Sequence, residues 1–226
     1  VAAPNVTTTP LNLRPTLGVC PAPSSVSSAR RLELPTPTAI VPGDLLLAVL
    51  ATTGDEEDEV SVSGWTNLVA VNNSNDVTLT VWLRTATSGE PAAHTWRWDD
   101  HQAAIGWILP LCNQHVTTPV AASEYATATG KSKTPWTPSV NAATDNSFLL
   151  RIGAFEKASM TANDETGLSG HTNLWARSVG NSLSAACGYV ASIPAGATGY
   201  RAFDLKSNEE YAVATIVITP RTPVGQ

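Results

Sequence analysis

Charged residues are scarce in this chain of 226 residues, since Asp, Glu, Lys and Arg together make up only 14% of it. Stretches rich in Glu, Lys and Leu are missing, whereas Thr, Ser, Ala and Val recur throughout, which argues against a mainly helical protein. The 13 basic residues against 19 acidic ones give a net charge of -6, and no Lys/Arg cluster exceeds the pair Arg30-Arg31. Nucleic acid is therefore a poor candidate partner.

Long apolar runs are also missing. The longest, Leu45 to Leu50 and Ile105 to Leu111, fall far short of the roughly 20 residues that cross a bilayer. We therefore expect a soluble chain with no membrane partner. It begins at Val1 rather than Met, which the removal of a leader or initiator residue would explain.

Cysteine occurs only at positions 20, 112 and 187. The three residues have neither C-x-x-C spacing nor a nearby His at metal-ligand intervals, so we expect no zinc site. Cys112 closes an apolar strand and Cys187 lies inside another, which favours buried free thiols. Cys20 lies in a Pro-rich segment, and a disulfide from it to either of the others or to a neighbouring subunit stays open.

Proline is dense in the first 42 residues, where it forbids helix and interrupts a sheet ladder. We predict an extended N-terminal arm over residues 1–37, a domain over residues 38–220 and a short tail over residues 221–226. The arm either docks on an assembly, in which case its removal leaves the domain folded, or it wraps its own domain and covers an edge strand. The predicted docking residues are Leu11, Leu13, Arg14, Leu17, Val19 and the exposed Trp136.

Beyond the arm the chain reads as short strands separated by turns. Val77 to Thr85 alternates apolar and polar residues with the period of a half-buried strand, and Trp82 on its polar face indicates a second covered surface. Further strands are predicted at Asp44 to Ala51, Leu68 to Val71, Ala93 to Trp98 and Ala103 to Cys112. This spacing is typical of all-β sandwiches and barrels.

The second half of the chain resembles the first. Gly64-Trp65-Thr66-Asn67-Leu68 recurs 106 residues later as Gly170-His171-Thr172-Asn173-Leu174, and the same shift places residues 77–85 over residues 183–191. Shifts of 103 and 107 place residues 44–47 over 147–150 and residues 103–109 over 210–216. Chance likeness between strands is the alternative. A real repeat predicts a jelly-roll-like antiparallel β-sandwich of two pseudo-repeated halves.

Catalytic signatures are missing, because the four histidines are isolated and no nucleophile–base, zincin or P-loop pattern occurs. We therefore predict no enzymatic activity. Asp99-Asp100-His101 reads as a turn between two strands, with a metal site as the less favoured interpretation.

The acidic run Asp55-Glu56-Glu57-Asp58-Glu59 is the sharpest polar feature, since five carboxylates in one loop repel one another unless cations or water screen them. Calcium would bind through carboxylate oxygens, but the run lacks the spacing of a calcium loop. A solvated acidic turn is favoured over a cation site or a basic partner. No other cofactor is expected.

Seven tryptophans are many for this length. Trp96 and Trp98 share one face of a predicted strand, where they would form either a sugar-stacking platform or, as we favour, part of the core.

Several short motifs together resemble a known module. They are Pro42-Gly43-Asp44-Leu45-Leu46-Leu47-Ala48, Gly64-Trp65, Trp82-Leu83-Arg84, Gly89-Glu90-Pro91 and Thr95-Trp96. In this order they resemble a β-sandwich module of bacteriophage structural proteins and of some bacterial extracellular proteins, over roughly residues 40–112. The acidic run and the Pro-rich arm depart from that pattern.

The resemblance implies a non-enzymatic virion structural protein on the virion surface, either a capsid decoration or a tail-associated protein. Its partners would be other virion proteins or copies of itself. The alternative is a secreted or cell-surface module that binds carbohydrate or mediates adhesion.

Overall fold

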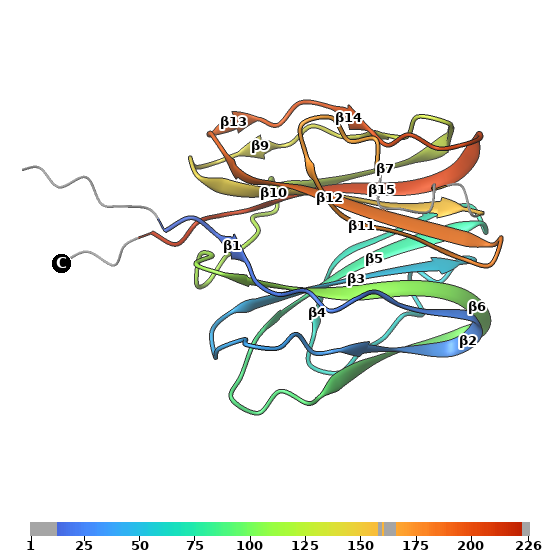
Figure 1. Ribbon diagram of the computed structural model, residues 1–226, viewed down its shortest axis with the longest axis horizontal. Coiled ribbons are helices and arrows are strands. Elements are labelled where there is room, and N and C mark those ends of the chain that lie inside the picture. Colours follow the sequence, from blue (N-terminus) through green and yellow to red (C-terminus); the bar gives the residue numbers. More distant parts are fainter. Residues whose placement is uncertain (1–12, 158–159, 161–165, 223–226) are drawn as a thin grey trace, which may run out of the picture.

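The computed structural model describes residues 13–157, 160 and 166–222, and none of these residues lies in a helix. Two antiparallel sheets stack face to face (Figure 1). The first contains β1 (Thr16–Leu17), β2 (Ser24–Pro35), β3 (Leu45–Thr53), β4 (Thr66–Asn73), β5 (Val77–Thr85) and β6 (Ala93–Cys112). The second contains β7 (Tyr125–Ser132), β10 (Ser147–Glu156), β11 (Thr172–Val179), β12 (Leu183–Ile193) and β15 (Glu209–Ile218). The predicted all-β sandwich is therefore confirmed.

Each sheet is built from one half of the described chain. The first has the order β6-β3-β5-β4, with both β1 and β2 along the outer side of β6, and the second has the order β7-β15-β10-β12-β11. Residues 113–124 connect them. The jelly-roll form of the prediction is not confirmed, because a jelly roll passes repeatedly between its two sheets, whereas this chain completes one sheet before it enters the other.

A single core fills the space between the sheets. The alternation in β5 turns Val77, Leu79 and Val81 into this core, as the sequence predicts. The inner residues of β3, β6, β10, β12 and β15 complete it, so the apolar inner faces of both sheets are buried in one shared core.

Both outer faces are also covered, which explains why β3 and β10 are apolar on both sides. On the first sheet, β2 and the crossover of residues 54–65 lie over a cluster that includes Trp82 and Trp96. On the second sheet, residues 133–142 and 194–205 form two short ribbons over two smaller clusters. The ribbons pair β8 (Trp136–Thr137) with β14 (Arg201–Ala202) and β9 (Asn141–Ala142) with β13 (Gly196–Ala197).

Strand β6 is longer than predicted, because the two strands expected at residues 93–98 and 103–112 are one. Asp99, Asp100 and His101 are exposed strand residues rather than a turn. The register between β2 and β6 shifts there, so a bulge accommodates these extra residues without ending the strand.

The predicted extended arm over residues 1–37 is not confirmed, and its residues 1–12 lie outside the described residues. From Ser24 to Pro35 the chain is strand β2 along its own β6, and the side chains of Leu32 and Leu34 are 4% and 0% exposed. This part of the N-terminal segment therefore wraps its own domain, which is the alternative to docking. Because removing β2 would uncover the outer cluster of the first sheet, we now expect truncation to destabilise the domain.

Candidate functional site

The motif residues that carry the resemblance meet on the outer face of the first sheet. The Arg84 guanidinium donates from Nη1 to the Gly64 carbonyl at 2.7 Å and lies 3.0 Å from a Glu90 carboxylate oxygen through Nε. The same Glu90 oxygen is 3.2 Å from Nε2 of His94. Trp65 donates from its indole nitrogen to Nδ1 of His94 at 3.2 Å and packs edge-on against Trp96 with ring centroids 5.1 Å apart.

Local structure holds this network in place. Gly64 has a φ of +76°, and a Cβ there would lie 2.5 Å from Nη1 of Arg84, so glycine is required. Glu90 accepts hydrogen bonds from the backbone and hydroxyl of Thr87. Burial alone would raise the pKa of Glu90, but the Thr87 and Arg84 donors outweigh it and lower the pKa below its ordinary value. Burial lowers the pKa of His94.

A Glu–His pair resembles part of a catalytic triad, but here Nδ1 of His94 is engaged by Trp65, and Nε2 lies 3.2 Å from Glu90 without a well-formed hydrogen bond. Nδ1 accepts from Trp65, which places the proton on Nε2 beside Glu90. No lone pair remains for removing a proton from a substrate. The motif residues therefore hold the outer layer of the first sheet together.

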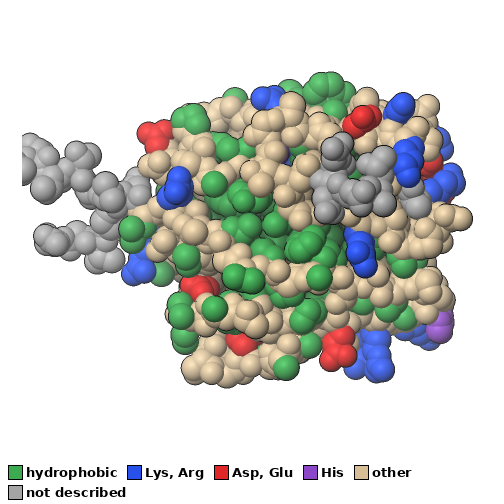
Figure 2. Space-filling model, viewed as in Figure 1, with side chains coloured by type: hydrophobic (Ala, Val, Ile, Leu, Met, Phe, Trp, Pro, Cys, Tyr) green, Lys and Arg blue, Asp and Glu red, His purple; other side chains and the backbone are tan. Residues whose placement is uncertain are grey.

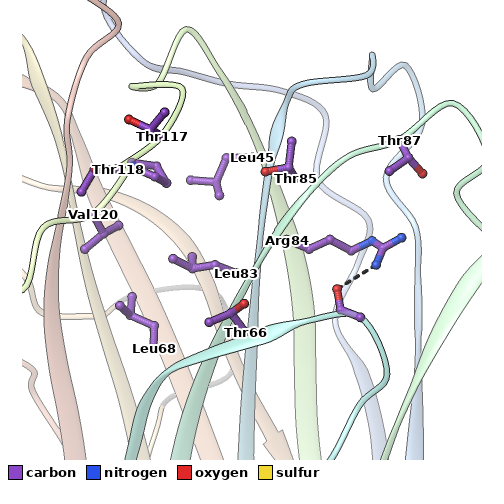
Figure 3. A pocket seen from close by; sticks show the side chains of 12 residues that line it. Leu45, Thr66, Leu68, Leu83, Arg84, Thr85, Thr87, Thr117, Thr118 and Val120 are labelled. Atoms are coloured by element: carbon purple, nitrogen blue, oxygen red, sulfur yellow. Dashed lines mark hydrogen bonds between the residues drawn. The ribbon is translucent and has the colours of Figure 1, made fainter.

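A groove of about 450 Å³ opens beside this network (Figure 3). Leu45, Leu68, Leu83 and Val120 point toward one another as its apolar floor, whereas Arg84 is turned away toward the Gly64 carbonyl. The threonines around it are Thr66, Thr85, Thr87, Thr117 and Thr118. The size is within the usual range of ligand pockets, but no free charged group faces it.

The corresponding place in the second half is filled. Shifts of 103 and 106 carry Leu45 and Leu83 to Phe148 and Tyr189, whose rings stack 5.2 Å apart with an interplanar angle of 11°. Leucines therefore line the groove at positions where the second half has two stacked aromatic rings.

Exposed aliphatic side chains gather at the end of the sandwich where the described chain enters and leaves. Leu13, Val19, Val41 and Val116 are 44%, 69%, 58% and 63% exposed. The segments that carry three of them are bonded to one another: Leu13 bridges Arg221, whose backbone nitrogen donates to Asn113, while the side chain of Gln114 donates to the Gly43 carbonyl. Figure 2 shows hydrophobic atoms at this end, beside the grey chain ends. We call these four residues the aliphatic end.

The other predicted docking residues are distributed differently. Arg14 is exposed, Leu17 is half-buried against the core between the sheets, and Leu11 lies outside the described residues. Trp136 is 57% exposed, but it lies on β8 over the second sheet, away from the N-terminal segment.

The acidic run forms the start of the crossover after β3, and its members differ. Asp55 and Glu57 accept hydrogen bonds from Asn72, whereas Glu56 is 1% exposed with one carboxyl oxygen unpartnered. Among the described residues, no three His, Cys, Asp or Glu side chains lie close enough together to hold a metal ion. The acidic run, for which the sequence favours a solvated turn over a cation site, has exposed carboxylates at Asp55, Asp58 and Glu59.

Trp96 and Trp98, for which the sequence favours core packing over a sugar-stacking platform, lie in the outer core cluster of the first sheet. Trp96 and Trp98 are 0% and 4% exposed, and Trp98 donates to the Ala29 carbonyl of β2 at 2.8 Å. The three cysteines are free thiols, and only Cys187 is fully enclosed. Burial raises the pKa of Cys20 to about 11, so its thiol is unreactive at neutral pH.

Arg151 is a buried charge that the sequence analysis missed. Its guanidinium is 0% exposed and donates to Nε2 of His171, the Thr215 hydroxyl and the Gly199 carbonyl, among other acceptors. Burial lowers its pKa to about 10. Arg151 thereby links the ribbons to the second sheet. The sequence signal that could have revealed it is a single arginine within the apolar run of residues 148–155.

In comparisons with family models, curated proteins and solved structures, nothing matched this chain. The resemblance to phage and extracellular modules therefore stays a prediction. No helix in the described ranges is long and apolar enough to cross a membrane. The fold and site define an all-β sandwich whose motif residues are engaged with one another.

Proposed function

We propose that this chain is a non-enzymatic structural part of a larger assembly, a capsid decoration or tail-associated protein on a virion surface. The observation that carries the proposal is the aliphatic end, where four exposed side chains surround the place at which the described chain enters and leaves. Exposed apolar groups gathered in one place favour a protein contact. The virion class is supported by the motif resemblance of residues 40–112.

Docking uses this end rather than a free arm. Leu13 and Val19 remain exposed docking residues, and Val41 and Val116 join them from other segments. The turns at the opposite end of the sandwich, such as the one between β11 and β12, then face away from the assembly.

A repeated unit accounts for the two sheets. Val49 pairs with Val81 and Trp107, and the shifts of 103, 106 and 107 carry these pairs to Ile152 with Cys187 and Ala214, which are also paired. The bulge between Asn67 and Val69 recurs between Asn173 and Trp175. Matching registers and bulges support duplication of one four-stranded unit over chance likeness.

The test is occupancy in purified particles, measured by quantitative mass spectrometry. Wild type should be present at a fixed, high copy number, and the double variant Val41→Asp with Val116→Asp should lose most of its occupancy while its circular dichroism stays unchanged. Asn181→Asp, in an exposed turn at the opposite end, is the matched control and should bind as wild type does.

Absence from particles, or normal occupancy of the double variant, would contradict the proposal. If the chain instead bound saccharides on a glycan array, and lost that binding on Trp136→Ala, the carbohydrate-binding alternative would replace it.

A further inference from the structure

The strands β4 and β7, on one side of the sandwich, contain few charged residues, although Asp55 and Glu57 of the acidic run accept hydrogen bonds from Asn72 of β4. β4 contains no charged residue, and β7 contains only Lys131, which pairs with Glu210 at 3.1 Å. The two strands lie next to each other, one from each sheet. On the other side, β2 carries Arg30, Arg31 and Glu33, and β11 carries Arg177. The β7 edge can therefore meet a copy of itself without bringing like charges of its own strand together.

β7 is an edge strand with little of the usual protection, since Lys131 is its one charged residue. The registers of the edge strands β2, β4 and β11 are each interrupted by a shift. β7 pairs with β15 in one uninterrupted register from Tyr125 to Ser132, and it contains no proline. Bulges, charges and prolines are what keep edge strands from pairing with other chains, so β7 is the edge most open to such pairing.

Half of the backbone groups of β7 point away from β15. Just before β7, the backbone nitrogen of Val217 donates to the Glu124 carbonyl at 2.8 Å. The backbone of Glu124 therefore faces β15, and so does that of the even-numbered residues of β7 that follow it. Because alternate residues of an antiparallel strand face the same neighbour, the outward set is Tyr125, Thr127, Thr129 and Lys131. Within the described part of the chain, no backbone hydrogen bond outside this ladder involves these four residues.

We propose that β7 pairs antiparallel with β7 of a second copy, with the two-fold axis at Ala128, so that two five-stranded sheets become continuous. In this register Thr127 lies opposite the partner's Thr129, and Tyr125 lies opposite the partner's Lys131. All four outward residues are then paired, and no two like charges face each other. The inference rests on the proposed assembly role and names a second copy as one partner.

Sedimentation velocity over a concentration series tests the pairing. Wild type should sediment as a dimer, and Thr127→Pro and Thr129→Pro should each sediment as monomers, because proline removes an outward N–H without touching the β15 ladder. Thr129→Val keeps the N–H and is the matched control, which should remain dimeric. A monomeric wild type, or dimeric proline variants with native circular dichroism, would overturn the proposal.

A charge exchange keeps the test decisive if the proline variants do not fold. Thr127→Lys with Thr129→Lys should be monomeric, as should Thr127→Glu with Thr129→Glu, since each places like charges opposite one another. An equal mixture of the two should form a mixed dimer. Failure to mix would overturn the proposal.

The register has its own test. Ala128→Cys lies on the two-fold axis in a non-hydrogen-bonded pair, where Cα atoms are about 4.5 Å apart and within reach of a disulfide. In a background with Cys20→Ser and Cys112→Ser it should form a covalent dimer on oxidation, whereas Ser25→Cys on the β2 edge should not. A dimer that Ala128→Cys fails to link would overturn this register.

The outcomes also separate this inference from the assembly role. A monomeric chain that is nevertheless present in particles would remove the β7 pairing and leave the assembly role standing. A chain that forms the β7 dimer but is absent from particles would contradict the assembly role and leave the β7 pairing standing.

Discussion

At the scale of single residues, Glu56 has the environment most unlike that of its neighbours in the acidic run. Asp58 and Glu59 are exposed, whereas Glu56 lies under the crossover with an unpartnered oxygen. Burial, followed by the nearby Glu59 and Asp100 carboxylates, raises its pKa to about 7, although a hydrogen bond from Gln102 opposes the shift. Within the acidic run, Glu56 is therefore the one buried carboxyl group.

This shift predicts a pH-dependent stability. Because the folded pKa is raised above the unfolded value of 4.5, folding holds the proton more tightly, so stability from this group falls as the pH rises from about 4.5 through about 7. Glu56→Gln removes the titration and should raise the free energy of unfolding at pH 8 by about 2 kcal/mol, with little gain at pH 5.

Urea denaturation of both proteins at the two pH values measures the difference. Asp58→Asn, an exposed change in the same loop, is the control and should follow wild type at both. A Glu56→Gln gain that is equal at pH 5 and pH 8 would show that burial does not perturb this carboxyl group.

At the scale of elements, β2 contributes directly to the fold. Leu34 is fully buried, and a Cβ on Gly106 of the neighbouring β6 would lie 3.0 Å from its side chain. Leu34→Ala should therefore lower the free energy of unfolding by about 3 kcal/mol, as expected for a buried leucine in a packed site. Val19→Ala, at a site 69% exposed, should change it by less than about 0.5 kcal/mol.

Chemical denaturation compares the two variants, and solubility of a chain lacking residues 1–35 extends the comparison to the whole strand. A truncated chain that melts like the intact one would mean that β2 is dispensable and would restore the docking-arm interpretation.

Strands inside the sheets could be predicted from sequence, whereas the covering layers could not. β5 occupies the predicted residues 77–85, and β3 begins one residue after its prediction, because alternation and apolar runs are local signals. Within β2 the sequence predicts only a short edge strand at residues 29–34, because prolines at residues 21, 23 and 35 obscure its full length and its partner β6 begins some sixty residues later. Pairing across that distance leaves no periodic mark in the sequence.

The candidate sites show the same limit. The motif order was visible, but that His94 joins Trp65 to Glu90 depends on a turn that brings three segments together. Val41 and Val116 lie in loops, and nothing local marks their side chains as exposed at the same end as Leu13. The aliphatic end follows from the tertiary fold alone.

At the scale of the whole molecule, the sheets face each other with matching neighbours. The edge strand β4 of the first sheet lies against β15 and β7 of the second sheet. In the same way, the edge strand β11 of the second sheet lies against β6 and β2 of the first. The groove departs from this correspondence, because Phe148 and Tyr189 have Leu45 and Leu83 as counterparts in the first half.

The correspondence predicts how the groove can be filled. Leu45→Phe with Leu83→Tyr copies the aromatic pair of the second half and should stabilise the fold by about 1 kcal/mol, as cavity-filling changes commonly do. The reverse pair, Phe148→Leu with Tyr189→Leu, should cost about 2 kcal/mol by opening a cavity. Differential scanning calorimetry measures both. Destabilisation by the first pair would show that the groove walls are too tight for a ring.

Because each sheet comes from a continuous stretch of chain, a cut between residues 112 and 125 would sever no strand. Each fragment would keep its own ladder of hydrogen bonds but would present its inner apolar face to water. The two fragments would therefore be obligate complements, and the linker between them serves as a tether that keeps each half at high local concentration for the other.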